Sequence, residues 1–107
     1  MPPSFDPAQM RQAASQASGL LKALSNPDRL LLLCQLTEGE HCVSELEALL
    51  DIRQPTLSQQ LGVLRQEGLV ETRRESKQIY YRIASARALA VLQTLYQQFC
   101  SAQGEPK

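Results

Sequence analysis

The most reactive side chains in this sequence of 107 residues are three cysteines, Cys34, Cys42 and Cys100. An odd number of cysteines does not suggest the disulfide framework of a secreted domain. In a reducing compartment such thiols are inert, redox-sensing or metal-binding. Cys34 lies in an apolar segment, and Cys100 follows Phe99 near the C-terminus. From the residues alone, Cys34 and Cys100 can each be a small packing residue or a reactive thiol. Cys42 precedes a helical pattern, where it can be a weak cap or a reactive thiol.

A second group of polar side chains is suited to hydrogen bonding. Most of these side chains lie at the start of an expected helix. In that helix Leu57, Leu61 and Leu64 keep the spacing of a buried stripe. Amide and hydroxyl groups at the N-terminal end of a short helix are typical of helices that read base edges in the DNA major groove. The candidates are Gln54, Thr56, Ser58, Gln59, Gln60 and Arg65. A polar helix face can equally be an ordinary solvated surface.

The charges are segregated along the chain, although the formal net charge is zero. Five acids and no base lie between Glu38 and Asp51, whereas six bases and three acids lie between Arg53 and Arg82. Local charge matters more than the sum for contacts with a phosphate backbone. The candidates in the basic segment that follows the helical pattern are Arg73, Arg74, Lys77 and Gln78. The alternative is a plain charged hairpin.

Hydrophobic periodicity and turn signals predict the elements that must position these groups. Helices are expected at about residues 7–24, 27–36, 55–67 and 85–102, with a short one after Cys42, and strands at 69–74 and 78–83. Asn26 is a good N-cap, and Gly68 suits the end of a helix. Residues 37–41 are expected to be a polar turn, and residues 75–77 to connect the strands.

These elements predict a mainly α fold with a small β-hairpin, that is, a winged helix-turn-helix. Two strands are marginal alone, so the hairpin must pack on the helices. The domain is expected at residues 7–102, with flexible tails at 1–6 and 103–107. The first and last helices carry more apolar surface than a domain of this size can bury, which predicts a symmetric homodimer. With no membrane-length apolar run and no signal segment, a cytoplasmic location is expected.

Three stretches resemble the ArsR/SmtB family of bacterial winged-helix repressors. They are LLKALSNPDRLLLLCQL at 20–36, QPTLSQQLGVLRQEGLVETRR at 54–74 and KQIYYRI at 77–83. The resemblance implies a DNA-binding repressor without enzymatic activity or cofactor, whose partners are operator DNA and a second copy of the chain. It also implies that the basic hairpin lies along the minor groove or the backbone.

Within the family, the chain most resembles the BigR-type branch, whose repressors respond to sulfide and persulfide. That branch carries one cysteine on the second helix and one near the end of the last helix. Cys34 in LLLCQL and Cys100 in QQFCSA stand at those positions. The resemblance therefore implies that these two are redox-sensing thiols, with reactive sulfur species as the inducer that oxidises or bridges them.

The chain departs from the metal-sensing members of the family. These often carry a Cys-x-Cys pair where this chain has Cys42 and Ser44, and others use histidines near the last helices, where this chain has none. Zinc requires about four ligands in fixed geometry, so no metal site is expected, and His41 is expected to be a solvated turn residue. Two alternatives stay open: a repressor that responds to metal or to general redox change, and a small redox or persulfide carrier that does not bind DNA.

Overall fold

Five helices and three strands make up the part of the chain that the computed structural model describes, residues 6–100. Their order is α1 (Pro7–Leu24), α2 (Pro27–Leu36), β1 (His41–Cys42), α3 (Val43–Leu50), α4 (Thr56–Gln66), β2 (Val70–Glu75), β3 (Gln78–Ile83) and α5 (Ala86–Phe99). Apart from Asp6, the tails expected at 1–6 and 103–107 lie outside the described residues, as do residues 101 and 102 of the expected last helix.

Local side-chain chemistry sets the ends of the helices. The Asn26 side chain accepts a hydrogen bond of 3.0 Å from the Arg29 backbone N–H, which caps α2 as predicted. Gly68 follows α4 with a positive φ of 75°, and the N–H of the next residue, Leu69, bonds to the carbonyl of Leu64 at 3.0 Å. This is a Schellman ending, in which glycine takes the left-handed conformation without strain.

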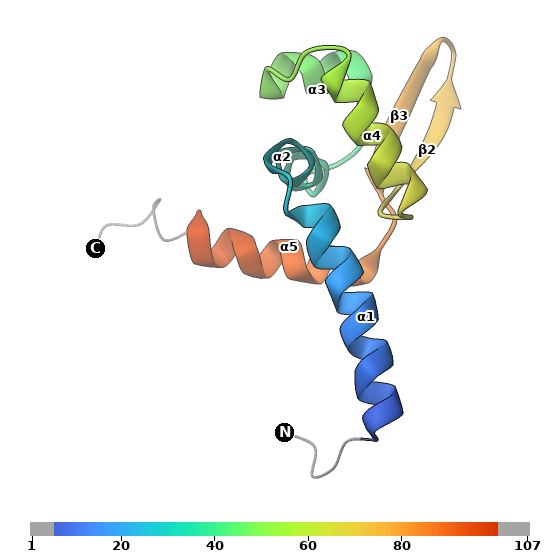
Figure 1. Ribbon diagram of the computed structural model, residues 1–107. Coiled ribbons are helices and arrows are strands. Elements are labelled where there is room, and N and C mark those ends of the chain that lie inside the picture. The colour runs from blue at the N-terminus through green and yellow to red at the C-terminus, as the bar shows by residue number, and fades with distance from the viewer. Residues whose placement is uncertain (1–5, 101–107) are drawn as a thin grey trace, which may run out of the picture.

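Helix α2 lies at the centre of the molecule, between α5 and the pair α3 and α4 (Figure 1). Its Leu32 and Leu33 are fully buried, as is the predicted apolar stripe of α4. The other fully buried large side chains come from α3 and α5. One apolar core therefore holds the two helices of the helix-turn-helix against the central helix.

Helix α1 extends away from this core (Figure 1), and only Ala23 and Leu24 at its C-terminal end are buried. Leu21 on α1 is 59% exposed, and Phe99 at the end of α5 is 67% exposed. A single chain thus leaves much of the apolar faces of α1 and α5 uncovered.

The sheet has three strands in the order β1-β3-β2, all antiparallel. The sequence predicted only the hairpin of β2 and β3 and missed the third strand. In that strand, His41 and Cys42 pair with Tyr81 and Tyr80 of β3. A strand of two residues has no periodicity from which it could be recognised. The hairpin connection is also shorter than expected, since β2 and β3 reach residues 75 and 78 and leave a two-residue turn.

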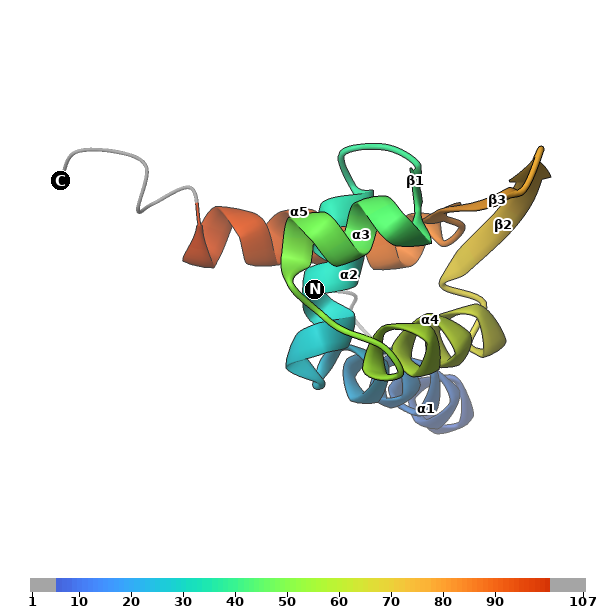
Figure 2. The ribbon, with the colours of Figure 1, turned by 90° about the horizontal axis from the view of Figure 1, so that it is seen from above.

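The hairpin of β2 and β3 extends beyond the helices, next to the end of α4 (Figure 2). Helices α3 and α4, this hairpin and α5 form a winged helix-turn-helix, as predicted. Within residues 6–100, no helix is both long and apolar enough to cross a membrane.

Candidate functional site

The outer face of α4 presents a small set of polar side chains. Ser58, Gln59 and Arg65 are exposed, while Thr56 is half-buried. A Cβ built on Gly62, in the middle of this face, would meet no atom within 4 Å. The fold therefore does not require a glycine there, and its lack of a side chain lets a large ligand approach the backbone of α4 closely.

Two of the predicted recognition residues are engaged within the chain. Gln60 is half-buried, and its Oε1 accepts a hydrogen bond of 2.9 Å from Nη1 of Arg29 on α2. Gln54 uses its Oε1 to accept from the Ser58 backbone N–H at 3.1 Å, which leaves its amide group for other partners. Gln60 thus ties α4 to the central helix, a role that its position in the sequence did not reveal.

Arg29 is a structural residue that the sequence did not single out. Its Nε donates to the carbonyl of Ala23 on α1 at 2.8 Å, in addition to the contact with Gln60 on α4. One guanidinium therefore bridges three helices. A single arginine near a helix start carries no sequence signal of such a role.

The hairpin carries two kinds of basic residue. Arg73 is held by the carboxylates of Glu40 and Glu75, at 2.8 and 2.6 Å, and lies over the ring of Tyr80 at 4.8 Å from its centroid. The hydrogen bond from Arg73 lowers the pKa of the Glu40 carboxyl. Arg74 points to the opposite face of the strand, because successive residues alternate.

Arg74, Lys77 and Gln78 are exposed near the tip of the hairpin. Among the described residues no ion pair is recorded for Arg65, Arg74 or Lys77. These three cations are therefore available to an external anion, as is exposed Arg53 just before α4, whereas the charge of Arg73 is already compensated within the chain.

Cys34 and Cys100 line one cavity of about 290 Å³ between α2 and α5. The other side chains of its wall are apolar or aromatic: Leu30, Leu95, Tyr96 and Phe99. Cys34 is half-buried and Cys100 is exposed, and both are free thiols. The fold thus brings together two cysteines that are far apart in the sequence, in largely apolar surroundings.

The pKa of the Cys34 thiol is raised, first by burial and second by the charge of Cys100. A raised pKa lowers the fraction of Cys34 that is thiolate at a given pH, so the two thiols resist ionising together. Burial and this coupling together make the Cys34 thiolate less populated than that of an ordinary thiol at the same pH.

Replacing Cys100 by serine is expected to lower the pKa of Cys34 part of the way to its ordinary value, because burial remains. Alkylation of Cys34 by iodoacetamide should then become faster over the pH range in which the Cys34 thiolate forms. The measurement is the alkylation rate against pH, followed by mass spectrometry. Cys42→Ser should leave this profile unchanged. An identical profile for the Cys100 variant would show that the two thiols are not coupled.

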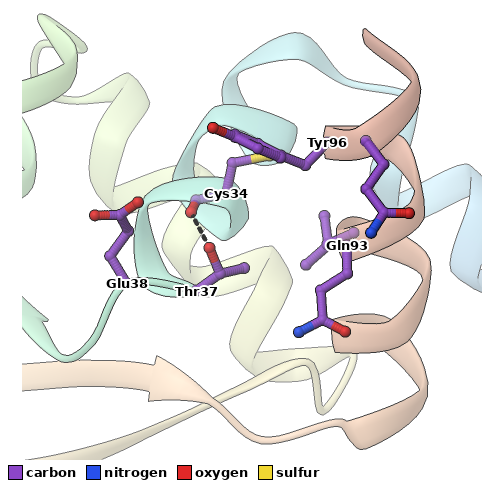
Figure 3. Close-up of a pocket in the computed structure, with 7 residues that line it drawn as sticks. Cys34, Thr37, Glu38, Gln93 and Tyr96 are labelled. Atoms are coloured by element: carbon purple, nitrogen blue, oxygen red, sulfur yellow. Dashed lines mark hydrogen bonds between the residues drawn. The ribbon is translucent and has the colours of Figure 1, made fainter. Parts of the chain in front are cut away.

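A second and larger cavity, of about 560 Å³, adjoins Cys34 on the side of the α2 C-terminus (Figure 3). It is open to solvent and is lined by Cys34, Thr37, Glu38, Leu92, Gln93, Tyr96 and Gln97, of which all but Cys34 and Leu92 are exposed. Cys34 and Tyr96 line both cavities. Apart from Cys34, the sequence analysis did not single out these lining residues as functional.

Cys42 caps α3 as predicted: its backbone N–H donates to the Glu45 carboxylate at 3.0 Å, and the residue is buried. The expectation for His41 was wrong. His41 is half-buried in β1, and its Nδ1 lies 3.4 Å from Oε1 of Glu45. Within residues 6–100, no three His, Cys, Asp or Glu side chains gather in a way that could hold a metal ion.

Comparisons with known proteins agree with this geometry. The family model "Bacterial regulatory protein, arsR family" matches residues 26–72. The chain is 56% identical to a biofilm growth-associated repressor of Agrobacterium fabrum over 92 aligned residues. The aligned region covers 86% of this chain and 79% of that protein.

Two solved structures are similar along nearly the whole chain. The transcriptional repressor BigR from Xylella fastidiosa superposes with a TM-score of 0.83 at 52% identity, over 91% of this chain and 99% of that one. A homodimeric winged helix-turn-helix DNA-binding domain from Mycobacterium bovis gives a TM-score of 0.69 at 31% identity, over 100% of both chains.

Proposed function

The chain belongs to the ArsR family of bacterial regulatory proteins, and we propose that it is a homodimeric repressor that reactive sulfur species release from its operator. The observation that carries the proposal is the apolar cavity that Cys34 and Cys100 share. It joins the central helix of the DNA-binding domain to the last helix, so a bond across it ties these two elements together.

The dimer is supported by the uncovered apolar surface of α1 and α5. A groove of about 420 Å³ between them is lined mainly by aliphatic side chains, which include Leu20, Leu21 and Val91. A twofold axis would let each chain cover the same face of the other, and a large apolar side chain contributes about 1.5–3 kcal/mol on full burial. The similar domain from Mycobacterium bovis is itself homodimeric.

We expect Leu21→Asp to convert the dimer to a monomer, because it places a charge in this apolar interface. Sedimentation at micromolar concentration measures the change. Leu49→Asp is the matched control, since Leu49 is similarly exposed, at 55%, but lies on α3. A wild-type protein that sediments as a monomer, or a Leu21 variant that stays dimeric, would contradict this arrangement.

Operator binding is assigned to the exposed residues of α4 and to the hairpin. A dimer presents two copies of α4 to successive major grooves, which requires half-sites about one helical turn apart. Ser58 and Gln59 would contact base edges, with Gln54, Thr56 and Arg65 beside them. We assign Gln60 to the contact with Arg29 rather than to a base, because its oxygen is already used.

In the hairpin, Arg74→Ala and Lys77→Ala are each expected to weaken binding to all DNA sequences. Each would flatten the slope of log affinity against log salt by about one, because one phosphate contact is lost. Arg73→Ala is the comparison: its charge is compensated by Glu40 and Glu75, so its salt slope should change little. Binding measured at several salt concentrations tests this. Unchanged binding of the Arg74 and Lys77 variants would show that the hairpin is not a DNA-binding wing.

The switch requires a sulfur donor of the type R–S–SH. One cysteine thiolate attacks the outer sulfur, R–S⁻ leaves and is protonated, and the cysteine becomes a persulfide. The second thiolate attacks the cysteine-bound sulfur and expels HS⁻, so that two thiols are oxidised to a disulfide while the sulfane sulfur is reduced to hydrogen sulfide. If both cysteines first become persulfides, their condensation gives a trisulfide and one hydrogen sulfide.

The test of the proposed function is binding to the DNA upstream of the protein's own gene, measured by gel shift with and without a persulfide donor. We expect binding by the reduced protein and release by the donor, together with a mass change of two lost hydrogens for a disulfide, or of one gained sulfur and two lost hydrogens for a trisulfide. Release by a metal ion alone would favour a metal-responsive repressor. Sulfur uptake without any DNA binding would favour a persulfide carrier.

A further inference from the structure

We propose that the polar cavity beside Cys34 binds the carrier group of a low-molecular-weight persulfide, and that it favours a carrier with an ammonium group. This inference rests on the proposed function, because it names the class of sulfur donor that reaches the dithiol. The cavity volume of about 560 Å³ lies in the usual range for small-ligand sites. The apolar cavity that Cys100 lines is about half as large.

The two cavities suit different parts of such a donor, the carrier group and the chain of sulfur atoms. A carrier with charged and amide groups requires hydrogen-bonding partners, and Gln93 and Tyr96 bring an amide and a hydroxyl group to the larger cavity. The Thr37 hydroxyl donates to the Cys34 carbonyl at 2.6 Å, so only its oxygen is left, as an acceptor. A chain of sulfur atoms has little need of them and suits the smaller cavity, whose wall is apolar around the thiols. Because Cys34 lines both cavities, it lies where the carrier ends and the sulfane sulfur begins.

The charge of the larger cavity selects the carrier. Glu38 is its one charged lining residue; no lysine or arginine contributes to the wall, and no ion pair is recorded for Glu38 among the described residues. Glu38 lies in the turn after α2, across the cavity from Gln93 of α5 (Figure 3). An uncompensated carboxylate attracts an ammonium group and repels a carboxylate.

The site requires that the partner chain in the proposed dimer cover the groove between α1 and α5 and leave the face of Tyr96 open. Arg87 and Val91 line the groove toward α1, whereas Gln93 and Tyr96 line the cavity. Arg87 and Tyr96 are separated by about two and a half turns at 3.6 residues per turn, so they lie on opposite faces of α5. A partner chain that covers the α1 side therefore leaves the carrier site open.

Binding here places the outer sulfur of the donor near the Cys34 thiol. The Cys34 thiolate attacks that sulfur, the sulfur–sulfur bond of the donor breaks, and the carrier leaves as a thiolate that takes up a proton. Cys34 gains one sulfur atom and the carrier becomes a thiol, with no net change in electrons. Holding the donor in place raises the rate because the reaction becomes effectively unimolecular.

The test compares two donors of similar size, the persulfides of cysteamine and of mercaptoacetate, which carry an ammonium and a carboxylate. The readout is the rate at which Cys34 gains one sulfur atom, measured by intact mass in a Cys100→Ser background. Glu38→Gln is expected to slow the cysteamine donor about threefold to fivefold, the upper range for one exposed charge contact. Glu38→Lys should reverse the preference and speed the mercaptoacetate donor.

Two controls make the outcome decisive. Glu47→Gln removes an exposed carboxylate on α3, outside the cavity, and should change neither rate. Inorganic polysulfide has no carrier, so its rate should be the same for all variants. Equal rates for the two organic donors in every variant, or an equal loss with inorganic polysulfide, would overturn the carrier site. A wild-type protein that takes up sulfur from no donor would refute the sensing function itself.

Discussion

Changing Cys34 or Cys100 to serine is expected to leave operator binding intact and to abolish release by persulfide. Serine is close to cysteine in size, so the cavity between α2 and α5 is kept, but it cannot form a bond through sulfur. Wild-type release should change affinity by about 5–150-fold, which corresponds to a coupling of about 1–3 kcal/mol. In each variant the donor should cause no change in operator affinity. Operator affinity with and without donor is the measurement.

The size of the effect follows from where the bond would act. Cys34 lies on the central helix, which contacts α4 through Arg29 and Gln60, and Cys100 follows α5. A direct disulfide requires Cα atoms about 4.4–6.8 Å apart, whereas added sulfur atoms tolerate a longer gap. Either product constrains α5 against α2, and in a dimer held through α1 and α5 it therefore changes the spacing of the two α4 helices.

Cys42→Ser is the control for this prediction. Cys42 is only 4% exposed and caps α3, and serine is the better N-cap, so both DNA binding and release should be kept. If Cys42→Ser alone abolished the response, the pair Cys34 and Cys100 would not be the sensor. The cap of α3 would then be the responsive thiol.

The second large effect is expected from Gln59 on the outer face of α4. Gln59→Ala should lower affinity for the operator by about 1–3 kcal/mol at the matched base, because a bidentate base contact is lost. Affinity for unrelated DNA should change little, so the sequence preference relaxes. Ser58→Ala should act in the same direction. Competition binding with operator and random duplexes measures the ratio.

Gln60→Ala is the matched control on the same helix. Its side chain is turned to Arg29, so the expected loss is about 0.5–1.5 kcal/mol of stability from one hydrogen bond, with the base preference unchanged. Thermal unfolding and the same competition assay separate the two outcomes. If Gln60→Ala relaxed the base preference and Gln59→Ala left it unchanged, then Gln60, and not Gln59, would be the residue that contacts the base.

Local signals predicted the elements well, because helices are specified by contacts within a few residues. The stripe of Leu57, Leu61 and Leu64, the Asn26 cap and Gly68 all occur as expected. The short strand β1 was missed because it depends on pairing with β3, about forty residues later in the chain. A pattern within the sequence contains no information on such a distant backbone partner.

The amino-acid sequence by itself determined the order of the helices and of the two long strands, the buried stripe of α4 and the types of side chain that could contact DNA or sulfur. Only the tertiary structure decided which of those side chains are available. It placed Glu40 and Glu75 on Arg73, Arg29 on Gln60, and Cys100 beside Cys34. The physical reason is that propensity and capping act within one turn or hairpin, whereas ion pairs, hydrogen bonds and shared cavities form between side chains that the packed core brings together.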